Sequence, residues 1–448
     1  MGNGKSGGLS IGAFMRDENI LYWIWLSQRC GIASKDFGRL MSKYESPFDI
    51  YRFDDDETER IEGISPTLKI KLTDKSLDSA YSVLKYCKQK KVEIVPYSDE
   101  RYPARLRSIE DPPVLLYALG EIPQMNDRLC IGMVGTRKMS EYGRESAYKI
   151  SYELASANAV VVSGMALGVD GVSACGALAA GGKTVAVLGC GISVVYPKEH
   201  EKLMREISKK GAVITEYPPN ERPHGYNFPK RNRIISGLCQ GVLVVEGSMG
   251  SGALITAKRA VDQGRELFAL PGKINESNSE GPNELIKNGA NVALGADDII
   301  SHYDFLYHDC INYNGLRKAK SGGVSVDAAL RKYGVASIYR KGNGYKVSDE
   351  EKPVENAIEK TRENIPEKVH AIPEEQTTPA VRAVAETMLE SVEPAHRKVF
   401  EAMPIDRAVS ADMLPIEGVD IGEIITAFTM LEISGLIESL PGGMYIRK

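Results

Sequence analysis

Six short runs of valine, isoleucine and leucine recur between residues 130 and 272 without polar alternation. Strands buried on both faces of a parallel sheet have this pattern, because helices cover them on either side. Segments of helical periodicity separate the runs, so we predict an α/β fold with an extended Rossmann-like, doubly wound parallel sheet. The predicted strands are CIGMV (130–134), AVVVSG (159–164), TVAVLG (184–189), AVITEY (212–217), GVLVVEG (241–247) and ELFALPG (266–272).

The first hundred residues have helical periodicity instead. Two segments, GIASKDFGRL from Gly31 and GISPTLKIKL from Gly63, each open with Gly-Ile and carry a leucine nine residues after the glycine. Glycine permits the tight turn of a helix–hairpin–helix, so we predict a small helical N-terminal domain of the helix–hairpin–helix or SAM-like kind. Such hairpins can present N–H groups to a phosphate, but the pattern favours plain helical packing.

The order of the pattern weakens after about residue 305. Residues 315–346 are rich in Lys, Arg and Gly, which indicates a solvated charged face or an additional DNA contact, and 349–378 is acidic and Pro-punctuated like a linker. Three helical patterns and a hairpin turning at Gly442-Gly443 then outline a winged helix. We therefore predict a helical domain over 1–95, a Rossmann-like domain over 96–305, a basic segment and linker over 306–390, and a winged helix over 391–448.

Composition excludes several classes of protein. The 448 residues are 43% hydrophobic and 26% charged, as in ordinary globular domains, and no run approaches the roughly 20 apolar residues of a membrane span. The start lacks the apolar core of a signal peptide, so we expect a cytoplasmic protein. Seven dispersed cysteines and six dispersed histidines suggest neither a disulfide framework nor a metal site. With a net charge of −4, nucleic-acid binding requires a local basic patch.

Glycine-containing loops follow five of the predicted strands, at residues 135–143, 163–171, 189–191, 246–252 and 271–273. These loops should meet at one sheet edge, where glycine lets the backbone approach a phosphate-bearing ligand closely. Neither GxxxxGK[ST] nor GxGxxG occurs, which argues against ATP hydrolysis and NAD binding, and we expect no cofactor.

The stretch FPKRNRIISG, from Phe228, follows the predicted strand AVITEY (212–217) and should begin a helix at the same edge. Pro229 suits a first helical position, Arg231 and Arg233 add positive charge, and Arg137 after the first strand can donate two hydrogen bonds to a phosphate. A flat ring beside cations suits single-stranded nucleic acid, because unpaired bases stack on it while phosphates pair with the cations. The alternative is a core phenylalanine with snorkelling cations.

Catalytic candidates are few. Asp170, Glu216 and Glu246 lie near predicted strand ends, but no histidine or cysteine accompanies them in a recognisable dyad. Each is more simply interpreted as a helix cap or as the partner of an arginine.

A long series of motifs resembles the DNA-processing protein A family (DprA/Smf), strongly over about 97–300 and not at all over about 308–390. One departure is Gly250, where the family often has Arg or Lys before its SGALIT-like motif. The matching motifs are YSDERYPARLRSIEDPPVLLYALG (97–120), VGTR (134–137), SGMALGVD (163–170), the LGCG…VYP run (188–197), TEYP (215–218), FPKRNRIISG (228–237), SGALITA (251–257), ALPG (269–272) and GPNELIKNGA (281–290).

The resemblance implies a non-enzymatic, single-stranded DNA-binding recombination mediator. It further implies protection of incoming DNA during natural transformation, loading of the RecA recombinase, and dimerisation through the Rossmann-like domain. The DNA-binding residues that it implies are Arg137, Ser163, Gly164, Phe228, Lys230, Arg231, Asn232, Arg233 and Lys273.

Two alternatives stay open. The Rossmann-like architecture and glycine-rich loops also resemble nucleoside-monophosphate phosphoribohydrolases of the lysine-decarboxylase-like group, whose PGGxGTxxE motif supplies a catalytic Glu. In this chain Ile255-Thr256-Ala257 stands where that acid is expected. A transcription regulator led by the winged helix is the second alternative.

Overall fold

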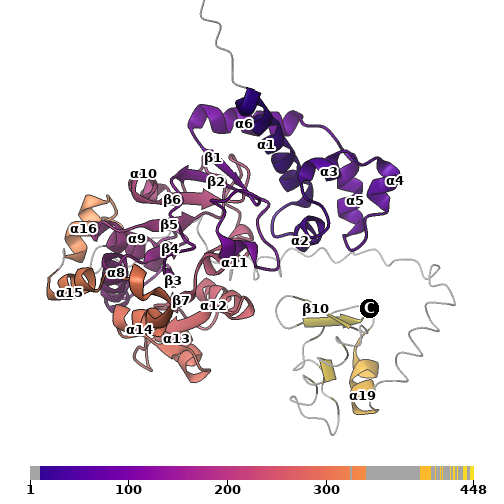
Figure 1. The fold of residues 1–448 in the computed structure, drawn as a ribbon. Helices are drawn as coiled ribbons and strands as arrows, with labels where there is room; N and C mark the ends of the chain where they lie inside the picture. Colours follow the sequence, from indigo (N-terminus) through magenta and orange to yellow (C-terminus); the bar gives the residue numbers. More distant parts are fainter. Residues whose placement is uncertain are drawn as a thin grey trace, which may run out of the picture. The chain divides into compact units, whose positions relative to one another are not determined.

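The computed structural model describes residues 11–322, 325–339, 394–404, 437–440 and 444–447, and the single positions 409, 414, 416, 424, 427, 428 and 431. The chain forms two compact units, Met1–Val354 and Glu355–Lys448. The first contains the sheet and most of the helices (Figure 1).

A nine-stranded sheet with the order β1-β2-β6-β5-β4-β3-β7-β8-β9 organises the first unit (Figure 1). All six predicted strands are present, and β3 to β9 pair in parallel. The strands are β1 (Glu93–Pro96), β2 (Leu115–Gly120), β3 (Cys130–Val134), β4 (Val160–Ser163), β5 (Thr184–Val187), β6 (Ala212–Thr215), β7 (Gly241–Val244), β8 (Glu266–Ala269) and β9 (Asn291–Val292).

The prediction of a sheet that is parallel throughout is wrong at one edge. Strand β2 pairs antiparallel with β6, where Tyr117 faces Thr215, and β1 pairs antiparallel with β2. The apolar pattern does not reveal this direction, because the first four residues of β2 are buried whichever way the strand runs. Strand β9, with two residues, is too short to show a period.

Helices cover both faces of the sheet, so alternate strand residues enter two different cores. In β4, Val161 belongs to one core and Val160 and Val162 to the other. The first core receives α8 (Glu141–Ser156), α9 (Val169–Ala179), α10 (Glu201–Lys210) and α14 (Ala296–Tyr307). The second receives α7 (Ala104–Arg107), α11 (Asn227–Leu238) and α12 (Gly252–Asp262), and α13 (Ser277–Lys287) follows β8.

The N-terminal part of this unit consists of helices. Gly31 and Gly63 both have positive φ, +74° and +83°, as the repeated Gly-Ile pattern predicts for tight turns. The helices are α1 (Ile11–Cys30), α2 (Lys35–Met41), α3 (Pro47–Tyr51), α4 (Asp55–Glu59), α5 (Pro66–Thr73) and α6 (Asp78–Lys90).

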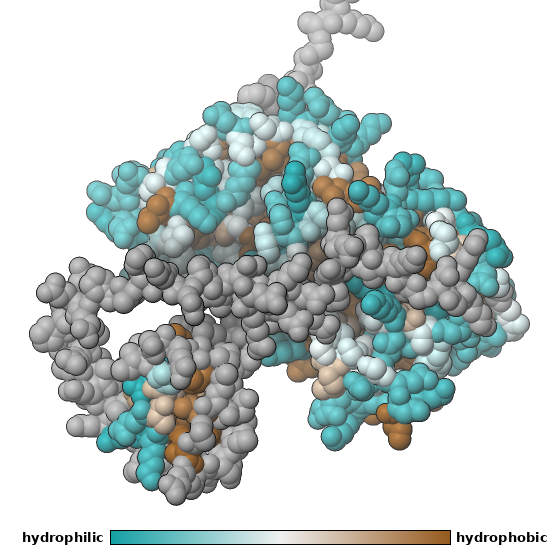
Figure 2. Space-filling view, turned by 180° about the vertical axis from the view of Figure 1, so that it is seen from behind, coloured by the Kyte–Doolittle hydropathy of each residue, from teal (hydrophilic) through white to brown (hydrophobic). Residues whose placement is uncertain are grey.

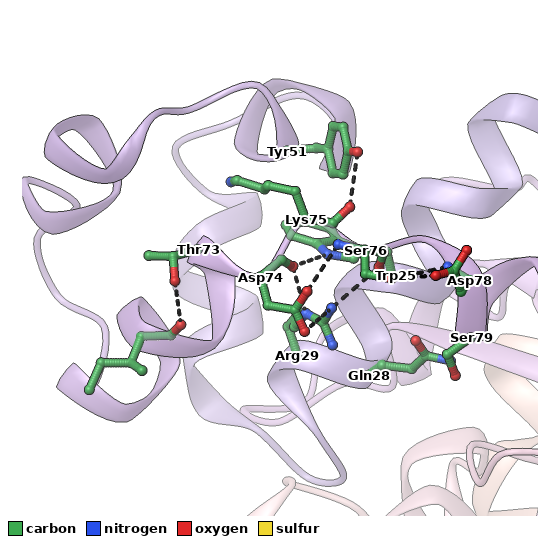
Figure 3. A network of polar contacts seen from close by, with 11 residues as sticks. Trp25, Gln28, Arg29, Tyr51, Thr73, Asp74, Lys75, Ser76, Asp78 and Ser79 are labelled. Carbon is green, nitrogen blue, oxygen red and sulfur yellow. Dashed lines mark hydrogen bonds and ion pairs between the residues drawn. The ribbon is translucent and has the colours of Figure 1, made fainter.

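Polar contacts tie the loop between α5 and α6 to α1 and α3 (Figure 3). The Trp25 indole donates to the carbonyl oxygen of Asp74 at 2.9 Å, and Arg29 forms an ion pair of 2.8 Å with the Asp74 carboxylate. The Tyr51 hydroxyl donates to the carbonyl of Lys75 at 3.0 Å. These contacts stabilise the helical packing.

The segment after residue 305 packs more closely than its charge suggests. It contains η2 (His308–Cys310), α15 (Tyr313–Ser321) and α16 (Val326–Lys332). Leu316, Leu330, Val335 and Tyr339 are buried in the core that also contains α8 and α9. The basic residues of these helices remain at the surface, so a solvated charged face describes only one side of the segment. The core of this unit therefore reaches Tyr339, beyond the domain end predicted at residue 305.

The second unit contains α19 (Pro394–Ala402) and an antiparallel hairpin of β10 (Ile437–Leu440) and β11 (Met444–Arg447). Val399, Phe428 and Ile437 contribute to its core. The predicted hairpin is therefore present. Much of the two other predicted helices and the whole acidic linker lie outside the described residues, so the winged helix stays a prediction.

In the part of the chain that the structure describes, no helix combines the length and apolarity needed to cross a membrane. The coloured atoms of the face shown in Figure 2 are mainly hydrophilic, with small apolar patches between polar side chains.

Candidate nucleic-acid interface

The candidate site lies at the switch point of the sheet. The chain builds β4 to β6 on one side of β3 and then crosses to β7 on the other, and the loops after these strands lie at the carboxyl ends, where ligands bind in such sheets. The loops are nevertheless packed tightly against one another. A Cβ atom on Gly168 would lie 2.2 Å from the carbonyl oxygen of Thr136, so only glycine allows this approach.

The loop after β4 is shaped by Asp170. Its carboxylate accepts a hydrogen bond of 2.9 Å from the Gly164 amide, and the Ser163 hydroxyl donates to its carbonyl oxygen at 3.3 Å. Burial raises the pKa of Asp170 to about 6. Ser163 and Gly164, expected to contact DNA, are buried here and their donors are used internally. In this structure they support the loop and offer no free donor.

Arg231 places a buried cation beneath this loop. Its side chain is 4% exposed, and its guanidinium donates to the carbonyl oxygens of Gly164, at 2.8 Å, and Val187. Gly164 leaves the space for it, since a Cβ atom there would lie 2.4 Å from Nη1 of Arg231. Among the described residues, no carboxylate lies within 4.0 Å of this guanidinium. Burial lowers the pKa of Arg231.

Phe228 lies at the edge of the site beside two guanidinium groups. The ring is half-buried, and its centroid lies 5.5 Å from Cζ of Arg137 and 5.9 Å from Cζ of Arg231. The Tyr196 ring is 5.4 Å away and tilted by 36°. Arg137 is exposed and free of ion pairs with other described residues, so its charge is available to a ligand. The structure therefore brings Arg137, Phe228 and Arg231 together, as the sequence analysis expected, while their contact with DNA stays a prediction.

Two aromatic residues that the sequence analysis missed, His224 and Tyr226, lie just before α11. Tyr226, 63% exposed, directly precedes α11, and its ring stacks on His224 with a centroid distance of 5.3 Å and an interplanar angle of 3°. The exposed Lys230 lies with Nζ 5.7 Å from the Tyr226 centroid. The four-residue spacing of Tyr226 and Lys230, which places both on one side of the helix start, was the available signal.

Arg233 does not join the site. It is 1% exposed, and its guanidinium pairs with Glu216 at 2.5 Å and with Asp111 at 3.4 Å. Residues two positions apart on an α-helix point about 200° apart, so Arg231 and Arg233 necessarily face opposite sides of α11. The expectation that Arg233 meets a phosphate is therefore corrected: the side chain forms a buried ion pair.

The remaining two predicted residues differ in position. Asn232 is 9% exposed, accepts a hydrogen bond of 3.2 Å from Nε of Arg231, and donates to the Gly252 carbonyl oxygen at the start of α12. Lys273 is exposed beyond β8 and forms an ion pair of 3.0 Å with Glu276. We therefore assign Asn232 to packing beneath the site. Lys273 has no described contact with the other site residues.

The three acids considered for catalysis all have structural partners. Glu246 accepts hydrogen bonds from the amide and hydroxyl of Ser140, the N-cap residue of α8, and Glu216 pairs with Arg233. Glu216 is thus the partner of an arginine and Glu246 supports a helix cap, as their sequence positions favoured, whereas Asp170 accepts from the Gly164 amide of its own loop. No group of three or more His, Cys, Asp or Glu side chains suited to a metal ion occurs among the residues with described positions.

These features define a doubly wound α/β protein whose switch point presents glycine-rich loops, an exposed arginine and an aromatic edge. The sequence of residues 93–304 matches the family model described as DNA recombination-mediator protein A. The chain is also 40% identical over 217 residues to the DNA processing protein DprA of Bacillus subtilis (strain 168), which covers 48% of this chain and 73% of that relative. The chain belongs to this recombination-mediator family, as its motifs suggested.

A solved structure agrees with this assignment. The X-ray structure of DNA processing protein A from Streptococcus pneumoniae matches with a TM-score of 0.54 and 33% identity, over 63% of this chain and 97% of that one. A structure described for the single-stranded DNA binding mode of DNA processing protein A from Helicobacter pylori has a TM-score of 0.45 and 30% identity, over 49% and 98%. The second TM-score is too low to add to the fold assignment.

Proposed function

We propose that this chain binds single-stranded DNA at the switch-point site and acts there as a recombination mediator, without making or breaking a covalent bond. The observation that carries the proposal is the half-buried Phe228 ring beside two guanidinium groups, at 5.5 Å and 5.9 Å. A base can stack on the Phe228 ring while its phosphate meets Arg137.

The buried charge of Arg231 favours an anionic ligand further. Its guanidinium donates to the neutral carbonyl oxygens of Gly164, after β4, and Val187, at the end of β5. The Asp170 carboxylate nearby offsets only part of the positive charge of Arg231 and Arg137. Lys230 adds a second exposed cation, and the stacked pair of Tyr226 and His224 adds a second aromatic surface. Duplex DNA keeps its base faces stacked internally, so this combination favours single strands.

A binding titration at several salt concentrations tests the proposal. A fluorescently labelled oligothymidylate and a duplex of the same length are titrated with the full chain, and anisotropy is measured. We expect the single strand to bind more tightly at each salt concentration, with affinity decreasing as salt increases. Equal affinity for both probes, or no binding of the single strand, would overturn the proposal.

The later steps of the proposed function rest on the family resemblance. We propose that the bound strand is protected from nucleases in the cytoplasm during natural transformation and is then passed to RecA. Nuclease digestion of the bound oligonucleotide tests the first step, and RecA filament formation with and without this chain tests the second. Full digestion, or filament formation at an unchanged rate, would contradict the respective step.

We also propose a homodimer through the Rossmann-like unit. Strand β9 lies at the end of the described sheet, and Val292 and Leu294 nearby are 46% and 68% exposed. An open strand edge with apolar side chains is suited to pairing with a second copy. Sedimentation of the wild type should give a dimer, and Leu294→Glu should give a monomer; an unchanged dimer would place the interface elsewhere.

The enzymatic alternative has little structural support. In α12, Ile255, Thr256 and Ala257 occupy the positions where the phosphoribohydrolase motif requires a Glu. Chromatography of AMP after incubation with the chain tests this alternative, and release of adenine would restore it. Sequence-specific duplex binding would instead favour the transcription regulator.

A further inference from the structure

A closed chain of hydrogen bonds holds the loop after β4 from beneath. Nδ1 of His200 lies 3.0 Å from the Met165 carbonyl oxygen, and Nε2 lies 2.8 Å from the Tyr339 hydroxyl oxygen. The Gly168 amide donates to the same hydroxyl at 3.2 Å. His200 is fully buried and Tyr339 is 3% exposed, so water does not compete with these contacts.

The proton positions in this series of hydrogen bonds follow from the chemistry of the groups. A carbonyl oxygen can only accept, so Nδ1 of His200 carries the hydrogen and donates to Met165. A neutral imidazole then has a lone pair on Nε2, which accepts from the Tyr339 hydroxyl. The Tyr339 oxygen retains a lone pair for the Gly168 amide. One arrangement of protons thus satisfies the hydrogen bonds of His200, Tyr339 and the two backbone groups.

The loop needs such support because its backbone is unusual. Met165 has φ of +54°, a left-handed conformation that non-glycine residues rarely adopt, and Gly168 has φ of +81°. The hydrogen bonds hold the loop at both of these residues, through the Met165 carbonyl and the Gly168 amide. Gly171 makes room for it, since a Cβ atom there would lie 2.6 Å from Cε1 of His200 and 2.6 Å from the Tyr339 hydroxyl.

We propose that His200 and Tyr339 are positioning residues that hold the loop after β4 in its DNA-binding shape. The loop carries the Gly164 carbonyl that accepts from Arg231, so its shape sets the position of the buried cation beneath the site. Tyr339 lies outside the matched range 93–304, so part of the site's support comes from a segment beyond it. The link to DNA rests on the proposed function, whereas the support of the loop does not.

The test variant is Tyr339→Phe in the full chain, which removes the hydroxyl and keeps the ring. We expect hydrogen exchange at the loop amides, measured without DNA, to become about tenfold faster, as for the loss of one net hydrogen bond. We also expect single-stranded DNA affinity to fall by about five- to tenfold with an unchanged salt dependence, because no phosphate contact is lost. Tyr333→Phe is the control: Tyr333 is equally buried on the same segment but has no described hydrogen bond to this loop.

A second pair of variants separates positioning from general packing. His200→Asn keeps a donor near Nδ1 and should retain slower loop exchange than His200→Ala. Loop exchange in Tyr339→Phe equal to that in Tyr333→Phe would overturn the inference, and so would equal exchange in the two His200 variants. If the wild type fails to bind single strands, the proposed function fails, and the exchange result still decides the positioning role.

Discussion

The guanidinium carbon of Arg137 lies 5.5 Å from the centroid of the Phe228 ring, although the two residues are far apart in sequence. Arg137 follows β3 and Phe228 is the second residue of α11, so the fold of the sheet brings the contact about. A cation beside a ring favours a fixed orientation of both groups by about 0.5–1 kcal/mol at an exposed site. The pair therefore prepares one phosphate contact and one stacking surface together.

Replacing Arg137 and Lys230 together by alanine should weaken the salt dependence of single-stranded DNA binding. Each lost phosphate contact lowers the slope of log K against log salt by about 0.7, so the double variant should lose about 1.4. The measurement is anisotropy from low to moderate salt. Lys183→Ala is the control, because Lys183 is exposed just before β5, at the amino end of the strand and opposite to the site. A double variant with the wild-type slope would show that neither cation meets a phosphate.

Much of this site could be predicted from particular residues. The valine-rich runs identified the central strands, and the glycines after them marked the edge where Arg137 and Phe228 meet. Helical phase alone could have excluded Arg233, because Arg231 and Arg233 cannot share one face of α11. Other features depend on distant packing that local patterns do not encode. The contact of Tyr339 with His200 spans 139 positions, and the direction of β2 depends on its pairing with β6.

Phe228→Leu should weaken single-stranded DNA binding without changing the salt slope. Leucine retains apolar packing near Gly189 but lacks the flat ring, and stacking contributes about 1–3 kcal/mol per base. We therefore expect affinity to fall by between fivefold and a hundredfold, with little change for duplex DNA. Phe48→Leu is a matched control, because Phe48 lies 5.7 Å from a guanidinium carbon, that of Arg52, in the helical N-terminal part. Equal losses for both DNA forms would argue against base stacking.

Arg233→Met should affect stability and leave the salt slope unchanged. Removing one partner of a buried ion pair leaves Glu216 and Asp111 without their cation, which costs about 3–5 kcal/mol. Urea unfolding measures this loss, and salt titration of the folded variant measures the slope. Adding Glu216→Gln should recover part of the stability, because it removes one of the uncompensated carboxylates. A lower slope in the folded variant would return Arg233 to the DNA site.

Two buried groups near the loop after β4 should give opposite dependences of stability on pH. Burial lowers the pKa of His200 from 6.5 to about 4, so the unfolded chain takes up the proton first as pH falls. The stability from neutral His200 is therefore fully present above pH 6.5 and is lost towards pH 4. Asp170, with its pKa raised from 3.8 to about 6, contributes stability that is present below pH 3.8 and is lost as pH rises through 6.

Urea unfolding at pH values between 4.5 and 7 can separate these contributions. Relative to the wild type, His200→Asn should lose less stability on acidification, by up to about 3 kcal/mol, since one pKa unit corresponds to about 1.4 kcal/mol. Asp170→Asn should lose more, because it removes the group that opposes His200 in this range. The difference from the wild type is the quantity to compare, since other carboxylates titrate equally in all three proteins. If both variants follow the wild-type curve, neither group is buried as the structure places it.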